Sequence, residues 1–415
     1  MVRLNIITLS VDTGISMVMK IDNIQDIRFA DYCRTGSFVI FISGVTGQDG
    51  SHMVDYLLKN EPNAFIIGGA RRLSVENHHN IAHLEHEPRF QLVNFDLTDS
   101  HSIYKLIEYA KPDYFINFAA QSFVASSWDF ARQTWECNST AILDCLEAIK
   151  RLKPSCRFYN AGSSEEFGNV EYSPQDELHP PKPRSPYGAS KAAARTLIKV
   201  YRESYGMYAV QGWLFNHEGT RRGEEFVTRK ITKGVARIKK AIDYKTKSGL
   251  GGFDPLKPLE LGNVDVKRDW SDAEDMVDAV WRMLNQEKHN STVPLPTKKD
   301  GVTYSIRDLS TWIRDYVVSS DENHSIREFV EKAFEYAGID NLTWHGNGTN
   351  EELWYRGKNG YEYLLVKINP KFYRPAEVEV LRGDSSEIRK DLGWKPKSDF
   401  KTLVKKMIEN DLTLA

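Results

Sequence analysis

The stretch that decides the fold reads Phe38-Val-Ile-Phe-Ile-Ser43 and continues as Gly44-Val-Thr-Gly47-Gln-Asp-Gly50. An apolar run is followed by glycines at the spacing G-x-x-G-x-x-G, and these open a helix-like segment at Ser51–Lys59. Glycines permit a tight turn and a close approach of the backbone to a pyrophosphate at a helix N-terminus. A glycine-rich loop alone is often a simple turn, but the flanking strand and helix favour a dinucleotide site.

Strands and helices alternate along the chain beyond this segment. We expect strands at 38–43, 65–69, 90–96, 114–119, 157–161 and 209–215, and helices at 51–59, 102–110, 129–152 and 187–205. Such alternation is typical of parallel βαβ units. The predicted fold class is therefore α/β, a doubly wound parallel sheet of the Rossmann type, with ligands at the carboxyl ends of the strands.

The regularity fades after Phe215, which predicts a smaller, discontinuous C-terminal lobe. The expected domains are an N-terminal extension at 1–37, a Rossmann domain at 38–215 with a returning segment near 262–284, and the second lobe at 216–415. In the second lobe, 326–337 and 400–409 are expected to be amphipathic helices, and 240–258 and 286–303 to be loops or insertions. The extension is assigned no function.

Composition limits the classes of function. The chain has 415 residues and a formal net charge of −2, so no broad basic surface for nucleic acid is expected. No stretch approaches the roughly 20 apolar residues of a membrane span, and no secretory signal is recognised. The four cysteines show no Cys-x-x-Cys spacing. We therefore expect a cytoplasmic protein without nucleic-acid or membrane partners.

A second motif indicates the type of reaction. Tyr187 and Lys191 form a Tyr-x-x-x-Lys pair that shares one helix face, and Ser163 and Glu165 lie upstream. An ammonium beside the phenol lowers its pKa from about 10 toward neutrality. Ser, Tyr and Lys together are typical of nicotinamide-dependent hydride transfer, and the added carboxylate indicates an elimination. The pair alone is common on surface helices, so its interpretation depends on the other motifs.

The cofactor form is predicted from the end of the second strand. An NAD site usually has Asp or Glu about 20 residues after the glycine loop, but here Arg71 and Arg72 follow Gly69-Ala70. Two guanidiniums suit a 2′-phosphate, so we favour NADP over NAD, the alternative being a solvated arginine pair. Asp96 and Leu97 are placed to meet the adenine, and Asn117–Ser122 to line the central part of the cofactor.

These residues resemble the extended short-chain dehydrogenase/reductases and, within them, the GDP-mannose 4,6-dehydratase family. The resemblance covers roughly residues 39–412, apart from stretches near 243–257 and 286–313. Its most specific segments are Phe215-Asn-His-Glu218, Arg221-Arg-Gly223 and Phe226-Val-Thr-Arg-Lys230, with Arg184–Lys191, Lys267–Trp270 and Tyr373–Pro375 also matching.

The resemblance implies a redox-neutral dehydration of a GDP-sugar. Tyr187 would take the proton of the 4-hydroxyl as C4 gives a hydride to NADP⁺, and Glu165 would take the C5 proton as the 6-hydroxyl leaves. The hydride would then return to C6. Ser163 would hydrogen-bond near O4, and Lys191 would hold the ribose and lower the pKa of Tyr187.

The resemblance also implies which residues bind the two ligands. For the cofactor these are Gly44, Thr46, Gly47, Gln48, Asp49, Gly50, Arg71, Arg72, Asp96, Leu97, Ala119, Ala120, Gln121, Tyr187, Lys191, His217 and Arg222. For the substrate they are Ser122, Glu165, Asn216, Val227, Lys230, Arg268, Arg374 and Glu377. Arg268 and Lys230 suit the diphosphate, and Arg374 and Glu377 the ribose hydroxyls, although each alone reads equally as a surface charge.

Two departures leave alternatives open. Glu166 stands where the family has an apolar residue, so the base is Glu165 or its neighbour, and Phe123 stands where His is usual. The expected substrate is GDP-mannose, with GDP-manno-heptose as the alternative. A 4-epimerase, a reductase and a non-catalytic NADP-binding module are further alternatives. We expect a homodimer or homotetramer, and no metal site despite the helical spacing of His79, His83 and His86.

Overall fold

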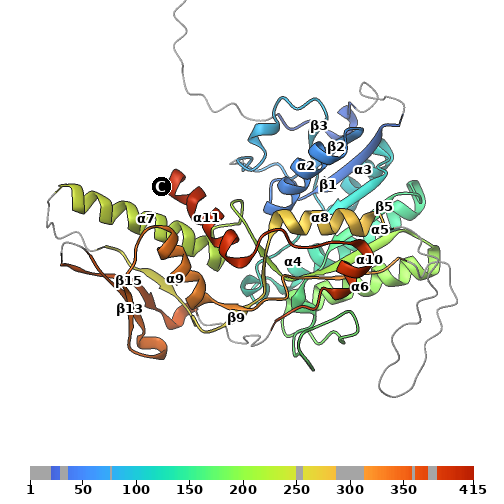
Figure 1. The fold of residues 1–415 in the computed structure, drawn as a ribbon. Coiled ribbons are helices and arrows are strands. Elements are labelled where there is room, and N and C mark those ends of the chain that lie inside the picture. The colour runs from blue at the N-terminus through green and yellow to red at the C-terminus, as the bar shows by residue number, and fades with distance from the viewer. Residues whose placement is uncertain are drawn as a thin grey trace, which may run out of the picture.

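The computed structural model describes residues 20–28, 36–74, 77–248, 256–286, 313–357, 360–372 and 381–415. These residues form two lobes, with the larger one built on a central sheet and the smaller one holding the helices and strands labelled α7, α9, β13 and β15 in Figure 1. The polypeptide passes between the lobes several times, so the second lobe is discontinuous in sequence.

The central sheet has seven strands in the order β11-β6-β5-β4-β1-β2-β3, and all six neighbouring pairs are parallel. The strands are β1 (Phe38–Ser43), β2 (Ala64–Ala70), β3 (Phe90–Asn94), β4 (Tyr114–Asn117), β5 (Arg157–Ala161), β6 (Ala209–Leu214) and β11 (Val317–Val318). The predicted doubly wound parallel sheet is confirmed. Chain order reverses between β1 and β4, and such a point opens a crevice at the carboxyl ends of the strands.

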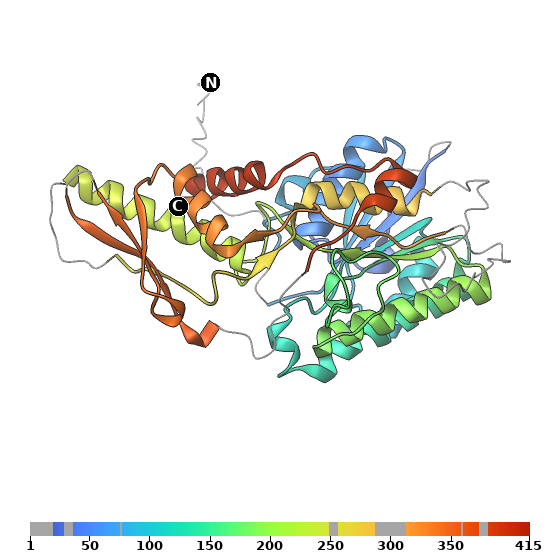
Figure 2. The same ribbon diagram turned by 60° about the horizontal axis from the view of Figure 1, so that its bottom comes forward.

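Helices cover both faces of this sheet (Figure 2). One face is covered by α2 (Gln48–Asn60), α8 (Ala273–Leu284) and α10 (Ser386–Leu392), and the other by α3 (Ser100–Ala110), α5 (Ala141–Leu152) and α6 (Pro186–Tyr205). The alternation within β1 explains this arrangement. Ile40 and Ile42 are buried in the first core and Phe41 in the second, because successive strand side chains point to opposite faces.

Two short segments have structure beyond what the sequence predicts. The expected helix at 129–152 consists of α4 (Ala131–Trp135), a π-helical turn at Glu136–Thr140 and α5. The N-terminal extension contributes residues 20–28 to the sheet edge, where Asp22 N donates to Leu92 O (3.0 Å) and Asn94 N to Asp22 O (2.9 Å). This segment therefore covers part of the open edge of β3.

The second lobe packs three helices against a four-stranded sheet. The helices are α7 (Val227–Ser248), α9 (Ile326–Tyr336) and α11 (Phe400–Leu414), and the strand order is β13 (Leu342–His345), β14 (Glu352–Arg356), β15 (Glu362–Ile368) and β8 (Leu259–Leu261). The two expected amphipathic helices are thus present as α9 and α11.

The prediction of a loop from residue 240 is wrong as far as Ser248, where α7 ends. The helix continues because Ile231, Val235, Ile238 and Ile242 recur at helical intervals and are buried in the core of the second lobe. The other expected insertion, at 286–303, lies beyond Gln286 outside the described residues.

Two small strand pairs connect the lobes. Strand β7 (Asn216–Glu218) is parallel to β10 (Trp270–Asp272), and β9 (Lys267–Arg268) is antiparallel to β12 (His324–Ser325). Among helices in the described part of the chain, none combines the length and apolar character that crossing a bilayer requires.

Candidate active site

A cavity of about 640 Å³ lies where the carboxyl ends of the central strands meet the second lobe. Predicted site residues that line it are Asp49, Ala120, Ser122, Ser163, Glu165, Tyr187, Lys191, Asn216, His217, Arg222, Val227, Lys230 and Arg268. The structure therefore brings the predicted catalytic set and most of the predicted substrate residues to one cavity. Arg374 and Glu377 lie outside the described residues.

The glycine loop is closely packed against the end of β4. Gly44 has φ +70°, and a Cβ built on it would lie 2.7 Å from Ala119 N. A Cβ on Gly50 would lie 2.4 Å from Gly44 O. Neither position accommodates a side chain, so the backbone at the start of α2 stays uncovered, as a pyrophosphate site requires. Thr46 and Gly47 complete this turn, and Gly47 is the N-cap of α2.

Glu165 and Glu166 lie in one 3₁₀ turn (Ser164–Glu166) but face different surroundings. The half-buried Glu165 borders the cavity. Glu166 is fully buried, accepts a 2.9 Å hydrogen bond from Ser163 N and forms an ion pair with Arg195. The Ser163 hydroxyl accepts from Glu165 N at 3.2 Å, which completes a capping box. Of the two carboxylates, only that of Glu165 borders the cavity.

Tyr187 and Lys191 lie on the first turns of α6, which begins at an N-cap, Ser185, followed by Pro186. The Lys191 Nζ lies 5.8 Å from the Tyr187 ring centroid and donates a 2.7 Å hydrogen bond to Ala161 O. The expected lowering of the Tyr187 pKa by Lys191 is wrong for the ligand-free protein, because burial raises this pKa to about 12, although the hydrogen bond with Ser163 acts in the opposite direction. Burial lowers the pKa of Lys191 to about 8.

His217 on β7 is held by two acceptors. Its Nδ1 lies 2.8 Å from Phe215 O, and its Nε2 lies 3.0 Å from Asp49 Oδ2 in the glycine loop. Because both partners only accept hydrogen bonds, the doubly protonated imidazole is the form that satisfies both of them. Burial acts to lower the pKa of His217, but Asp49 outweighs it and the pKa is raised. Gln48 Nε2 donates to His217 O at 3.1 Å, so β7 is bonded to the glycine loop twice.

Predicted cofactor residues farther along the sheet lie outside this cavity. Arg71 and Arg72 are exposed immediately after β2, and Arg72 N donates to Asn94 Oδ1 at 3.2 Å. Asp96 follows β3 and accepts from Thr98 N at 2.9 Å, while Leu97 is buried. Ala119 and Gln121 follow β4, with Gln121 N bonded to Asn138 Oδ1 at 3.0 Å. These residues lie at the carboxyl ends of β2, β3 and β4, outside the cavity lining.

The cavity is also lined by two aromatic residues, Phe226 and Phe372, that are not among the predicted site residues. Phe226 packs edge-on against Phe123, with ring centroids 6.0 Å apart, and the Arg222 guanidinium lies 3.6 Å from the Phe226 centroid. Lys230 Nζ lies 3.6 Å from the Phe372 centroid. Phe226 stands in the quoted Phe-Val-Thr-Arg-Lys segment, so its motif was a usable signal. No such motif points to Phe372, because it lies far from that segment in sequence.

The His79, His83 and His86 segment forms no helix beyond a 3₁₀ turn at Ala82–Leu84. His83 Nε2 lies 2.7 Å from Asp55 Oδ1. The described ranges hold no cluster of three or more His, Cys, Asp or Glu side chains suited to a metal ion.

Known proteins with similar sequences agree on one family. A family model described as GDP-mannose 4,6 dehydratase matches residues 41–313 and 299–407. A GDP-mannose 4,6 dehydratase of Drosophila melanogaster is 40% identical over 385 residues, which cover 91% of this chain and 86% of that protein. The Homo sapiens protein of the same description is 38% identical and covers 91% and 92%. The fold also resembles a UDP-glucose 4-epimerase of Thermotoga maritima, with TM-score 0.68, 19% identity and coverage of 91% and 100%.

Proposed function

Since this chain belongs to the GDP-mannose 4,6-dehydratase family, we propose that it converts GDP-mannose to GDP-4-keto-6-deoxymannose with NADP as its resident cofactor. The observation that carries the proposal is the meeting of Glu165, Tyr187 and Lys191 at one cavity. A simple reductase or epimerase needs the Ser, Tyr and Lys groups but no further carboxylate. The placement of Glu165 therefore favours elimination over both alternatives.

Each side chain has a separate task in this reaction. NADP, when bound, supplies the acceptor for a hydride from C4 and the donor that returns it to C6. Ser163 orients the oxygen at C4, and Tyr187 takes up the proton of that hydroxyl. The ketone at C4 acidifies the C5 proton, which Glu165 removes as the 6-hydroxyl leaves as water. The protons and electrons balance, so no external reductant is consumed.

The ionisation of Tyr187 depends on charge that must come from its surroundings. With a pKa near 12, the phenol is neutral in the ligand-free protein. A positive charge placed beside it favours the phenolate, and Lys191 supplies one as long as it remains protonated. The lowered pKa of Lys191 makes that supply dependent on pH in the range where the enzyme would work.

The proposal also includes the form of the cofactor and the nucleotide of the substrate. The preference for NADP is supported by the exposed Arg71 and Arg72 at the end of β2. Binding of the GDP-sugar is supported by Lys230 and Arg268 on the second-lobe side of the cavity. A homodimer or homotetramer and a cytoplasmic location complete the proposal.

A panel of nucleotide sugars tests this function. The purified protein is incubated with GDP-mannose, GDP-manno-heptose, dTDP-glucose and UDP-glucose, and the products are measured by mass spectrometry. GDP-mannose should lose one water, with no net change in the absorbance of reduced nicotinamide. Stoichiometric reduction or oxidation of added cofactor would contradict a dehydratase, and a preference for dTDP-glucose would contradict the nucleotide assignment.

A further inference from the structure

A row of buried polar side chains crosses four neighbouring strands of the central sheet. Ser43, Asn117, Asn160 and Gln211 are direct register partners on β1, β4, β5 and β6. The Ser43 hydroxyl donates to Asn117, Asn117 Nδ2 to Asn160 Oδ1 (2.7 Å), and Asn160 Nδ2 to Gln211 Oε1 (2.6 Å). Buried amides destabilise a core unless they are bonded, so this satisfied row fixes the strands relative to one another.

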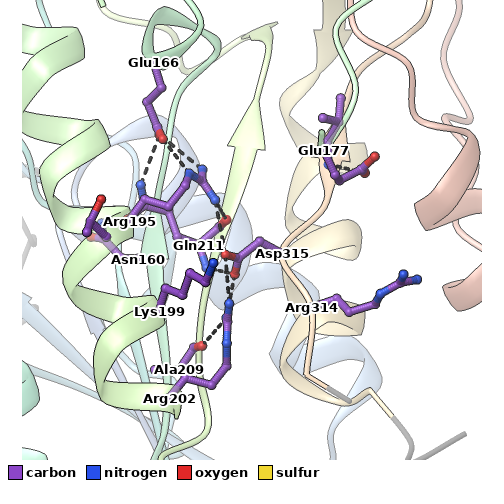
Figure 3. Close-up of polar contacts among 12 residues, drawn as sticks. Asn160, Glu166, Glu177, Arg195, Lys199, Arg202, Ala209, Gln211, Arg314 and Asp315 are labelled. Carbon is purple, nitrogen blue, oxygen red and sulfur yellow. Dashed lines mark hydrogen bonds and ion pairs between the residues drawn. The ribbon is translucent and has the colours of Figure 1, made fainter. Parts of the chain in front are cut away.

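The row ends at Glu166, beside the proposed catalytic turn. Gln211 Nε2 donates to Glu166 Oε1 at 3.0 Å, and Arg195 donates to both carboxylate oxygens, at 2.5 Å and 3.2 Å. Ser163 N donates to the same Oε1 at 2.9 Å. Figure 3 shows Arg195 between Glu166 and Asp315, with Gln211 alongside. Both oxygens of Glu166 are thus occupied by donors, which leaves the proton transfer to Glu165.

Arg195 also ties this cluster to the helix that carries Tyr187 and Lys191. It lies one turn after Lys191 on α6, its Nη1 donates to Gln211 O at 2.6 Å, and its guanidinium lies 3.4 Å from the Trp213 ring centroid. Gln211 Nε2 contacts Lys191 O at 3.0 Å as well. The ion pair between Glu166 and Arg195 therefore contacts the turn that carries Glu165, helix α6, which carries Tyr187, and strand β6 through Gln211.

We propose that Glu166 and Arg195 are positioning residues, whose ion pair sets the distance between the Glu165 carboxylate and the reacting carbon of a sugar held at Tyr187. The inference rests on the proposed function. It gives a role to the carboxylate that stands where the family has an apolar residue. Neither residue lines the cavity. Weakening the pair should therefore slow removal of the C5 proton without changing sugar binding.

Two single variants test the pair. Arg195→Lys keeps the charge but loses the two-pronged contact, and Glu166→Gln keeps the shape but loses the charge. Each should lower kcat by about 10- to 100-fold, the scale of a misplaced catalytic group. KM should stay within about twofold, because substrate contacts are retained. The isotope effect of deuterium at C5 should rise and that of deuterium at C4 should fall, since C5 proton removal becomes rate-limiting.

Arg202→Lys is the matched control. Arg202 is also buried on α6 and binds Asp315 through two contacts, at 2.9 Å and 3.2 Å. Its bonds run to Asp315 and Ala209 O and none reaches Glu166, although Asp315 Oδ2 also lies 3.4 Å from Arg195 Nη1. This variant should lower thermal stability about as much as Arg195→Lys, with wild-type kcat and isotope effects. If it reproduces the Arg195→Lys isotope effects, the pair has only a structural role.

A paired variant covers the case in which a single substitution prevents folding. Glu166→Leu with Arg195→Leu removes both charges at once and so leaves neither buried alone. It should show the same loss of kcat and the same rise in the C5 isotope effect. Wild-type turnover in the folded variants would overturn the positioning role alone. A wild-type protein that dehydrates no GDP-sugar would instead overturn the proposed function.

Discussion

His217 Nε2 lies 3.0 Å from Asp49 Oδ2, so strand β7, which precedes the second lobe, is joined by an ion pair to the glycine loop. The pair connects two segments that are far apart in sequence. Burial acts to raise the pKa of Asp49, but His217 and Arg222 hold it well below its usual value. The loop proposed to bind the cofactor and the strand proposed to bind the sugar therefore share one charged contact.

This contact should make stability depend on pH. Folding raises the pKa of His217 above its ordinary value of 6.5, so its stabilisation is complete below that value and is lost as the pH rises through the raised pKa. The difference in free energy of unfolding between wild type and His217→Gln should therefore be largest below pH 6.5 and shrink as the pH rises through the raised pKa. Urea unfolding at several pH values measures it. A constant difference would show that His217 is not charged in the folded protein.

Lys191 should lower the stability of the folded protein. Its pKa of about 8 corresponds to roughly 3 kcal/mol of destabilisation at neutral pH, since the unfolded chain holds the proton more tightly. Loss of its hydrogen bond to Ala161 O destabilises the folded protein by about 1 kcal/mol, which offsets part of this gain. Lys191→Met should therefore be more stable by about 2 kcal/mol at neutral pH and lose that advantage as the pH rises past about 8 to 10.5. Urea unfolding measures the gain. Tyr187→Phe, which leaves Lys191 in place, should show no comparable pH-dependent gain over that range.

Glu165 should be far more sensitive to substitution than its neighbour. Glu165→Gln removes the proposed base and should lower turnover by about 10²-fold or more. Reduced cofactor should accumulate, because oxidation at C4 proceeds while elimination stops. Glu166→Gln should be the milder change, since Glu166 acts through position. The measurement is turnover together with nicotinamide absorbance in a single-turnover experiment. The reverse order of damage would make Glu166 the base.

Much of the larger lobe could be predicted because its signals are local. The apolar run at Phe38–Ser43 and the glycines after it specify a strand, a turn and a helix over adjacent residues. Strand β11 could not be found this way. It has two residues, Val317 and Val318, and it exists because it adds to β6 across the fold. The helix past residue 240 is not predicted, because a Lys- and Gly-rich composition is typical of a loop, whereas the burial of Ile242 extends the helix.

The candidate site was predictable by residue type but not by orientation. Two adjacent glutamates are indistinguishable in a linear sequence, and the register depended on a resemblance. The two glutamates differ in their contacts: Arg195, which lies 29 residues beyond Glu166, binds the Glu166 carboxylate and holds it outside the cavity. Likewise, the charge on His217 depends on Asp49, which lies 168 residues earlier in the chain. Such contacts are set by topology, so no local pattern predicts them.

Arg71 and Arg72 should select NADP through its 2′-phosphate. Both are exposed after β2, where an NAD site would have a carboxylate. Replacing both by Ala should weaken NADP⁺ by about 1.5–3 kcal/mol for each charged hydrogen bond lost, with little effect on NAD⁺. Calorimetry measures both affinities, and Arg132→Ala, an exposed arginine paired with Glu136, is the control. Equal binding of the two cofactors by wild type would contradict the assignment.

Arg268 should act in binding rather than in chemistry. It is 8% exposed, lines the cavity on its second-lobe side and is held by β9, which pairs with β12. A guanidinium can place two parallel hydrogen bonds on phosphate oxygens, a geometry that lysine lacks. If it binds the diphosphate, the contact is present in both the ground and the transition state.

Arg268→Lys should therefore raise KM for the GDP-sugar by about tenfold or more while kcat changes by less than about threefold. Lys267→Met is the matched control, because Lys267 is the neighbouring residue on β9 but is exposed and not part of the cavity lining. It should leave both constants unchanged. Initial rates with GDP-mannose, and inhibition by GDP alone, separate the two effects, since GDP retains the diphosphate but has no reacting carbon. Inhibition by GDP should weaken in Arg268→Lys by the same factor as KM rises. A loss confined to kcat, with GDP inhibition unchanged, would place Arg268 at the sugar instead of the diphosphate.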